Sequence, residues 1–259
     1  MKKSLIVLFL LSITISAQSK ESLNIEGFFE GHNGCFVCFN KQSGEYFKYN
    51  RTRCKQRFLP ASTFKIPNSL IGLETKVIAD ENFVIKWDGV ERQIKEWNRD
   101  QTLSSAIQFS VVPYYQELAR RVGKTTMQKF LNEFSYGNKT IGKNVDRFWL
   151  DNSLKISADE QIEFLKKFYD YKLNISRRSI DIVKKIMPQE KYNKSLLKFK
   201  TGTGTKEDGN YIGWLVGYVE KENNVYIYAF NIEAKTYEEV KQLRDTKSRE
   251  ILKYLKIIE

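Results

Sequence analysis

The chain has 259 residues, of which 41% are hydrophobic and 14% aromatic, so a disordered protein is excluded and one domain, or two closely packed subdomains, is expected. Its formal net charge is +12, but its lysines and arginines are spread along the sequence among 31 acidic residues. This distribution is typical of a solvated, lysine-rich surface and argues against a nucleic-acid-binding protein.

The first residues have the layout of a secretory signal peptide. Two lysines precede an apolar core from Leu5 to Ile15, and the small residues Ser16 and Ala17 follow. The apolar core is too short for a permanent membrane anchor, and no cysteine follows it, which argues against a lipoprotein. We therefore predict that a signal peptide (1–17) is cleaved after Ala17 and that the rest is exported to the periplasm or secreted, without a stable membrane anchor.

Strand signals come first in the mature chain. Residues 34–50 predict a hairpin, because the strand-like stretches FVCFN and YFKYN flank the turn-rich KQSGE. A helix is expected after Ser62, where apolar residues continue on one side, and Pro67 is expected to strain or separate its first turn.

Helix signals dominate the middle of the chain, from about residue 79 to 187. Ser157 and the glutamate three residues later form a capping box that opens a helix. Another helix is expected from Ser179 onward, ended by Pro188.

The last quarter returns to strands. LLKFKTG, YIGWLVGYVE and VYIYAFNIEA predict an antiparallel meander, and a charged amphipathic helix follows, roughly from Thr246 to Leu255. We therefore expect an α/β (α+β) fold with a central antiparallel sheet flanked by terminal helices and an inserted, mainly helical subdomain. Residues 18–61 and about 190–259 would form the sheet subdomain, and about 62–189 the helical one, within one catalytic unit 18–259.

The cysteines and the histidine limit the chemistry. Cys35, Cys38 and Cys54 are few and odd in number, and residues three apart on a strand point to opposite faces, which disfavours a redox pair. We expect buried free thiols, with one disulfide as the alternative. His32 is the single histidine, so a metal hydrolase with several histidine ligands is excluded and no metal is expected.

Ser62 and Lys65 carry the first chemical signal. They stand three residues apart, so on a helical turn they share a face. A serine hydroxyl needs a base in contact to act as a nucleophile, and with His32 in a loop-like GHNG, Lys65 is the nearest candidate. Alone this spacing is weak, because a helix-start serine followed by a surface lysine is common.

Three further motifs follow in order. Ser110 begins a turn before a proline, YGN at residues 136–138 closes a helix, and Lys200, Thr201 and Gly202 end a strand, where a glycine lets a ligand approach the backbone. Each is weak alone, but together they are the marks of serine acyl-enzymes that recognise penicillins.

With these residues the chain resembles the class D serine β-lactamases along nearly all of its mature length. The stretches RFLPASTFKIPNSLIGLE, EWNRDQTLSSAIQFSVVPYYQELARRVG and DRFWLDNSLKISA are similar to that family. The phenylalanine in S-T-F-K, the YGN motif and F-W-L at residues 148–150 favour class D over class A or transpeptidases.

The resemblance implies roles for the motif residues. Ser62 would attack the lactam carbonyl and form the acyl-enzyme. Lys65 would be carbamylated by carbon dioxide to N6-carboxylysine and act as general base, with no other cofactor. Ser110, with Lys200 beside it, would relay a proton to the lactam nitrogen. The backbone amides of Ser62 and Thr203 would form the oxyanion hole.

Two apolar residues complete this catalytic set. Trp149 would donate to the carbamate and Val112 would shield it. Only the neutral amine takes up carbon dioxide, and burial among groups such as Phe64 and Leu150 lowers a lysine pKa by up to about 3–5 units. We therefore expect Lys65 to be buried.

The substrate is expected to be a β-lactam, a small molecule whose carboxylate Lys200, the strand segment Thr201, Gly202 and Thr203, and an arginine would hold. In the family that arginine stands shortly before the C-terminal helix. Arg244 fits best, with Arg249 as the alternative; Asp245 would weaken the field of Arg244. Trp97 and Trp214 are interpreted as core residues.

Other readings stay open. An exported penicillin-binding sensor would acylate without efficient turnover, and a peptidoglycan transpeptidase shares the S-x-x-K and K-T-G motifs but would lack Trp149. A non-enzymatic binding protein would not need Ser62 and Lys65 together. The sequence leaves open the oligomeric state and which β-lactams, carbapenems included, are preferred.

Overall fold

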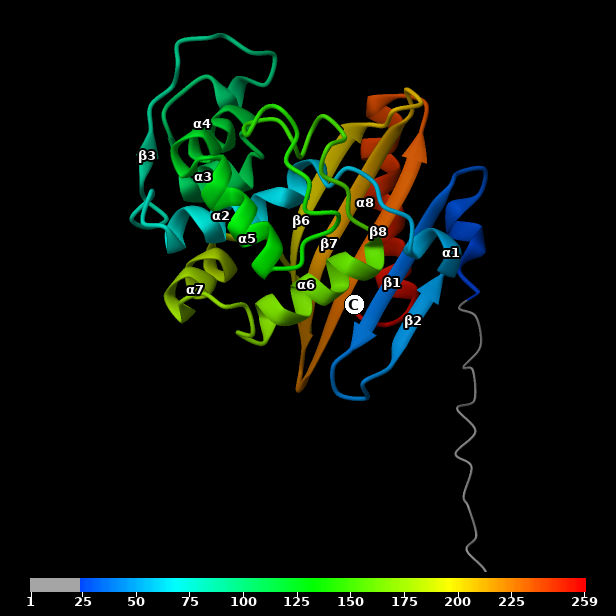
Figure 1. Ribbon diagram of the computed structural model, residues 1–259. Coiled ribbons are helices and arrows are strands. Elements are labelled where there is room, and N and C mark those ends of the chain that lie inside the picture. Colours follow the sequence, from blue (N-terminus) through cyan, green and yellow to red (C-terminus); the bar gives the residue numbers. More distant parts are fainter. Residues whose placement is uncertain (1–23) are drawn as a thin grey trace, which may run out of the picture.

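A six-stranded antiparallel sheet forms the centre of the computed structural model, which describes residues 24–259 (Figure 1). The spatial order is β2-β1-β8-β7-β6-β5. The strands are β1 (Gly34–Asn40), β2 (Tyr46–Tyr49), β5 (Gln189–Lys191), β6 (Ser195–Thr205), β7 (Tyr211–Lys221) and β8 (Asn224–Ala234). Because β1 pairs with β8, the two ends of the chain meet in the middle of the sheet. The predicted signal peptide lies outside the described residues.

Helices cover both faces of this sheet and form a separate helical region beside it (Figure 1). The α-helices are α1 (Arg51–Cys54), α2 (Lys65–Glu74), α3 (Leu103–Gln108), α4 (Val112–Val122), α5 (Lys124–Glu133), α6 (Ala158–Tyr169), α7 (Arg177–Ile186) and α8 (Tyr237–Tyr254). Three 3-10 turns are η1 (Glu26–Phe29), η2 (Ala61–Phe64) and η3 (Lys95–Trp97). The predicted α/β class, with a helical region inserted between strands, is confirmed.

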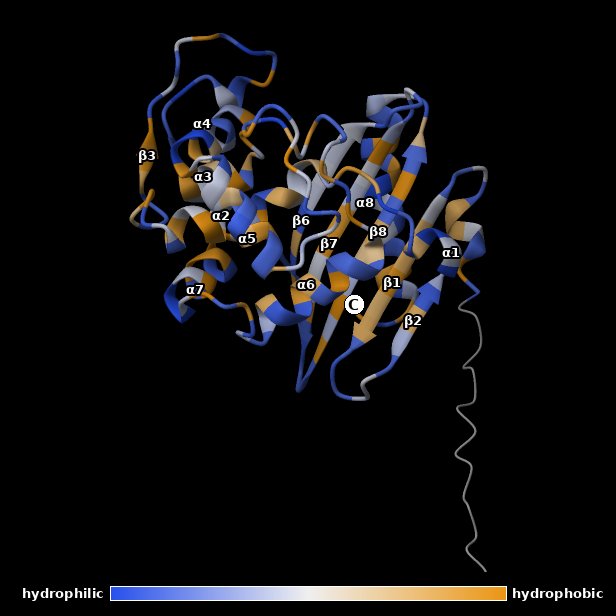
Figure 2. Ribbon diagram, viewed as in Figure 1, coloured by the Kyte–Doolittle hydropathy of each residue, from blue (hydrophilic) through white to orange (hydrophobic). Residues whose placement is uncertain are grey.

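Strand alternation sends side chains into two cores. On β7, Trp214 and Val216 point to the core that α6 and the helical region share, whereas Leu215 and Val219 pack on the opposite face against α8. Figure 2 shows the apolar character of the central strands against the hydrophilic connecting loops. The site described below lies where the core shared with the helical region meets residues 201–203 of β6.

Two expectations about the elements were wrong. The C-terminal helix begins at Tyr237, not near Thr246, because Thr236 caps it by accepting a hydrogen bond from the Glu239 backbone N–H. Its first turns bury few apolar side chains, so the sequence pattern was weak there. The stretch 79–102 is largely loop with a two-stranded sheet, β3 (Val84–Ile85) and β4 (Gln101–Thr102), rather than helix.

Pro67 does not end its helix, although the turn before α2, η2, is a separate 3-10 turn. It is the third residue of α2, and the N–H that proline lacks has no partner within the first turn of a helix. Among residues 24–259, no helix has both the length and the apolar character needed to cross a bilayer.

Candidate active site

The turn that carries Ser62 is fixed from several directions. Its 3-10 turn, η2, runs directly into α2 at Lys65. Just before it, the Leu59 carbonyl accepts a hydrogen bond from the Trp214 indole at 3.0 Å, and the Ala61 N–H donates to the Trp149 carbonyl at 3.1 Å. Ser62 therefore stands on a segment tied to both the sheet and the loop that follows α5.

Lys65 is buried beneath Ser62. Its side chain is 1% exposed, and its Nζ lies 2.9 Å from Ser62 Oγ and 5.2 Å from the centroid of the Tyr115 ring. Burial lowers the pKa of Lys65 from its ordinary value of 10.5 to about 7. The expectation that Lys65 is held inside the protein is confirmed.

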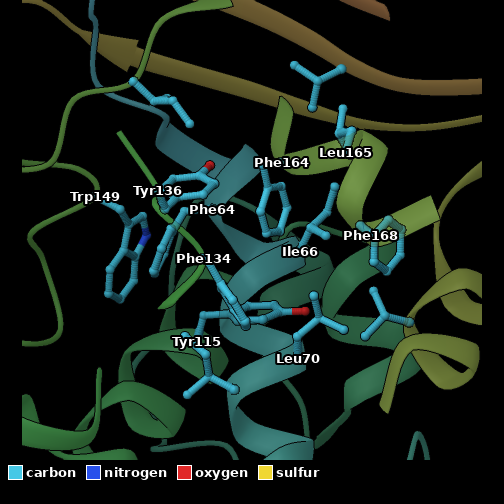
Figure 3. Close-up of a cluster of buried hydrophobic side chains, with 14 of the residues drawn as sticks. Phe64, Ile66, Leu70, Tyr115, Phe134, Tyr136, Trp149, Phe164, Leu165 and Phe168 are labelled. Atoms are coloured by element: carbon cyan, nitrogen blue, oxygen red, sulfur yellow. The ribbon is translucent and has the colours of Figure 1, made fainter. Parts of the chain in front are cut away.

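Aromatic side chains wall this side of the site (Figure 3). Phe64 stacks on Trp149 with ring centroids 5.5 Å apart and meets Phe148 edge to face at 5.0 Å. Trp149 is fully buried, and its indole N–H has no hydrogen-bond partner among the described residues. A buried donor without an acceptor is costly, so this pocket fits an additional acceptor such as a carbamate oxygen.

Ser110 and Lys200 form a second serine–lysine pair. Ser110 sits between α3 and α4 with a left-handed backbone (φ 52°), a conformation that costs energy for a residue with a side chain. Lys200 on β6 is 1% exposed and donates to Ser110 Oγ. Burial, and then the positive charges of Lys65 and Arg244, hold the pKa of Lys200 well below its ordinary value.

Arg244 reaches the site from α8. Its Nη1 donates to Thr203 Oγ1 at 2.7 Å, and Arg244 and Thr203 both line the site cavity. Arg249, the alternative, instead pairs with Glu190 and stacks over Phe199. The structure thus brings Arg244, and not Arg249, beside the strand segment expected to hold a carboxylate.

A cavity of about 330 Å³ joins these groups. Ser62, Ser110, Val112, Leu150, Thr201, Gly202, Thr203 and Arg244 line it, and so do Ile94, Trp97, Phe109, Tyr237 and Lys241. No acidic residue is among these described lining residues, so the chemistry rests on two serines, buried lysines and an arginine. Lys65, Lys200 and Trp149 lie fully buried beneath this surface.

The last five of those lining residues were not predicted from the sequence to belong to the site. Trp97, expected in the core, is only partly buried: it packs against the first core and also lines the cavity, and its indole N–H donates to the Phe109 carbonyl at 3.0 Å. Ile94 and Phe109 stay 39% and 44% exposed, an apolar signal in polar loops that carries no motif. The core assignment of Trp214 is confirmed.

Gly202 lines the cavity and is also required by packing. A β-carbon there would lie 2.8 Å from the Pro60 carbonyl oxygen and 3.2 Å from the Thr63 backbone nitrogen. Glycine is therefore required for β6 to pass closely behind the turn that carries Ser62.

The remaining candidates lie away from the cavity. Cys35, Cys38 and Cys54 are buried and unpaired, and burial raises the pKa of the Cys35 and Cys38 thiols. His32 lies near Glu239 at 3.9 Å and does not line the site.

Known proteins are similar to this chain over most of its length. Residues 34–253 match the family model of the penicillin-binding protein transpeptidase domain. The chain is 48% identical over 225 residues to β-lactamase OXA-48 of Klebsiella pneumoniae, covering 87% of this chain and 84% of that protein. The regulatory protein BlaR1 of Bacillus licheniformis is 36% identical over 236 residues, which cover 86% of this chain but 39% of that protein.

Solved structures agree. The crystal structure of a class D β-lactamase from Sebaldella termitidis matches with a TM-score of 0.88 at 37% identity, covering 92% of this chain and 98% of that one. High identity over most of both chains, and the same fold, leave one conclusion. The chain belongs to the class D β-lactamase family.

Proposed function

We propose that this protein hydrolyses β-lactam antibiotics through an acyl-enzyme on Ser62. The observation that carries the proposal is the contact of 2.9 Å between Ser62 Oγ and the buried Nζ of Lys65, whose pKa is lowered to about 7. A serine in contact with a base that is about half neutral at pH 7 is an activated nucleophile.

Each reacting atom has a partner in the cavity. Lys65 carries the base that takes the proton of Ser62 Oγ as the oxygen attacks the lactam carbonyl. The backbone N–H groups of Ser62 and Thr203 are the proposed donors to the oxyanion. Ser110 Oγ, in contact with Lys200, passes a proton to the lactam nitrogen as the carbon–nitrogen bond breaks. Thr201, Thr203 and Arg244, which line the cavity, are the proposed binding groups for the substrate carboxylate.

Lys65 is also the proposed site of carbamylation. A carbamate on its Nζ supplies an anionic general base for both acylation and deacylation. The unpartnered N–H of buried Trp149 and the nearby Lys200 amine, both possible donors, support a resident anion in this pocket, where the cavity lining offers no acid of its own. Val112 and Leu150, which line the cavity, restrict access of water to it.

Turnover tests the proposal directly. We expect the wild type to hydrolyse a chromogenic cephalosporin, benzylpenicillin and oxacillin, faster when bicarbonate is added, and mass spectrometry to find a transient adduct with the mass of the penicillin. Ser62→Ala should form no adduct. An adduct mapped to Ser110 would contradict the proposed acyl-enzyme on Ser62. An adduct that accumulates stoichiometrically without turnover would contradict hydrolysis and would favour the penicillin sensor that the similarity to BlaR1 suggests.

Export is a separate proposal. The predicted signal peptide supports a periplasmic or secreted enzyme that meets β-lactams outside the cytoplasm. N-terminal sequencing of the exported protein should begin directly after Ala17; a mature chain that keeps Met1 would contradict it.

A further inference from the structure

The substrate-facing arginine is already bound to a carboxylate of the protein. Arg244 Nε donates to Asp245 Oδ1 and Arg244 Nη2 donates to Asp245 Oδ2, both at 2.8 Å. This is the two-pronged geometry in which a guanidinium binds a substrate carboxylate most strongly. The Nε and Nη2 groups of Arg244, which could bind a substrate carboxylate in this way, are therefore already paired with Asp245 of the same helix.

What remains for a ligand is the Nη1 side. Nη1 donates to Thr203 Oγ1 at 2.7 Å, and Arg244 and Thr203 both line the cavity. The Arg244 side chain is 8% exposed, whereas that of Asp245 is 39% exposed. Asp245 thus holds the guanidinium from the solvent side and aims its third nitrogen at β6.

The charge of Asp245 reaches further into the site. Its carboxylate raises the pKa of Lys200, against the lowering by burial, Lys65 and Arg244. Its Oδ1 is also 3.8 Å from Arg249 Nη1. Asp245 is therefore the acid that offsets the cations on the substrate-carboxylate side of the cavity.

We propose that Asp245 is a positioning and specificity-determining residue, a built-in competitor that orients Arg244 and lowers the affinity of the site for the anionic group of its substrate. The inference rests on the proposed β-lactamase function. Asp245 makes no contact with the reacting atoms, so its effect falls on binding rather than on bond breaking.

The test compares Asp245→Asn, which keeps the shape and removes the charge, with the wild type. The KM for benzylpenicillin should fall about two- to fivefold, the size of a charge interaction at a half-exposed carboxylate, while kcat changes less than KM. KM should also rise more steeply with salt in the variant, because the cations of the site are then less neutralised. The methyl ester of benzylpenicillin, which has no carboxylate, should show no such gain.

Two variants separate this role from general effects of charge or structure. Glu250→Gln removes one acid from the same helix, where Glu250 pairs with Lys247 on the surface, and should leave KM unchanged. Asp245→Glu keeps the charge and should stay closer to the wild type than Asp245→Asn. An unchanged or raised KM in Asp245→Asn, or an equal fall for the ester, overturns the inference.

Failure of the proposed function gives a different pattern. If the wild type is acylated but does not turn over, the proposed hydrolase function is contradicted. The second-order rate constant of acylation then still shows whether Asp245→Asn prefers the anionic substrate over its ester. Equal acylation rates in wild type and variant would overturn the role of Asp245 alone.

Discussion

The two sides of the cavity control charge in opposite ways. On the helix side, Lys65 lies among aromatic rings with no acid, and burial alone brings its pKa to about 7. On the strand side, Arg244 is paired with Asp245 and Thr203. Desolvation yields a neutral base, and pairing yields a fixed, partly neutralised cation. Desolvation suits a group that must accept a proton, whereas pairing suits a group that must hold a ligand in place.

The largest effect should come from removing the base on the helix side. Lys65→Ala should lower turnover roughly 10²- to 10⁴-fold, the usual contribution of a general base. Lys184 is a matched control, because burial lowers its pKa to about 8 while it packs on the Tyr171 ring. Lys184→Ala should keep near-normal kcat in steady-state assays. If both variants lose activity alike, contact with Ser62 is not what matters.

The next effect sharpens the role of the unpartnered indole. Trp149→Phe keeps an aromatic ring but removes the donor proposed for a carbamate, at a cost of roughly 1–3 kcal/mol. Pre-steady-state measurements should show acyl-enzyme that forms but is released roughly 5- to 100-fold more slowly, with partial recovery in bicarbonate.

A surface tryptophan provides the comparison. Trp87 is 39% exposed, and Trp87→Phe should leave deacylation and its bicarbonate response unchanged. Normal deacylation in Trp149→Phe without bicarbonate would remove the indole from the mechanism.

The strand side should respond in KM instead. Arg244→Gln should raise the KM for benzylpenicillin about tenfold, near the lower end for a hydrogen bond to a charged group because Asp245 already offsets part of its charge. Arg249→Gln, whose guanidinium pairs with Glu190 and lies 3.8 Å from Asp245, should change KM less than Arg244→Gln does, even if unfolding occurs at a lower temperature. A larger KM effect in Arg249→Gln would reassign the carboxylate site.

Local patterns made part of this site predictable. Ser62 and Lys65 share one helical turn, so their spacing alone placed them in contact. The cavity rim was not predictable, because Ile94, Phe109 and Tyr237 come from separate segments that only the tertiary fold brings together. The position of Asp245 next to Arg244 predicted a weakened field, but the sequence did not show that the two side chains form a two-pronged ion pair.

The smallest expected effect is a pH dependence on the helix side. Only neutral Lys65 takes up carbon dioxide, so turnover without added bicarbonate should stand near half of its alkaline plateau around pH 7 and fall further below it, with bicarbonate moving the midpoint to lower pH. A profile that stays flat from pH 8 to 6 would contradict a titrating Lys65.

Stability should report the same titration independently of substrate. The pKa of Lys65 is lower in the folded than in the unfolded chain, where a lysine titrates near about 10.4, so the unfolded chain binds more protons between those values. The wild type should therefore gain stability relative to Lys65→Met as pH rises from 7 toward 10, and show a constant difference below pH 7, where both states are protonated. Denaturant unfolding at pH 6, 7 and 9 measures this difference. A stability difference that does not vary over that range would mean that Lys65 keeps its ordinary pKa, and burial would then have failed to produce the neutral base on which the helix side depends.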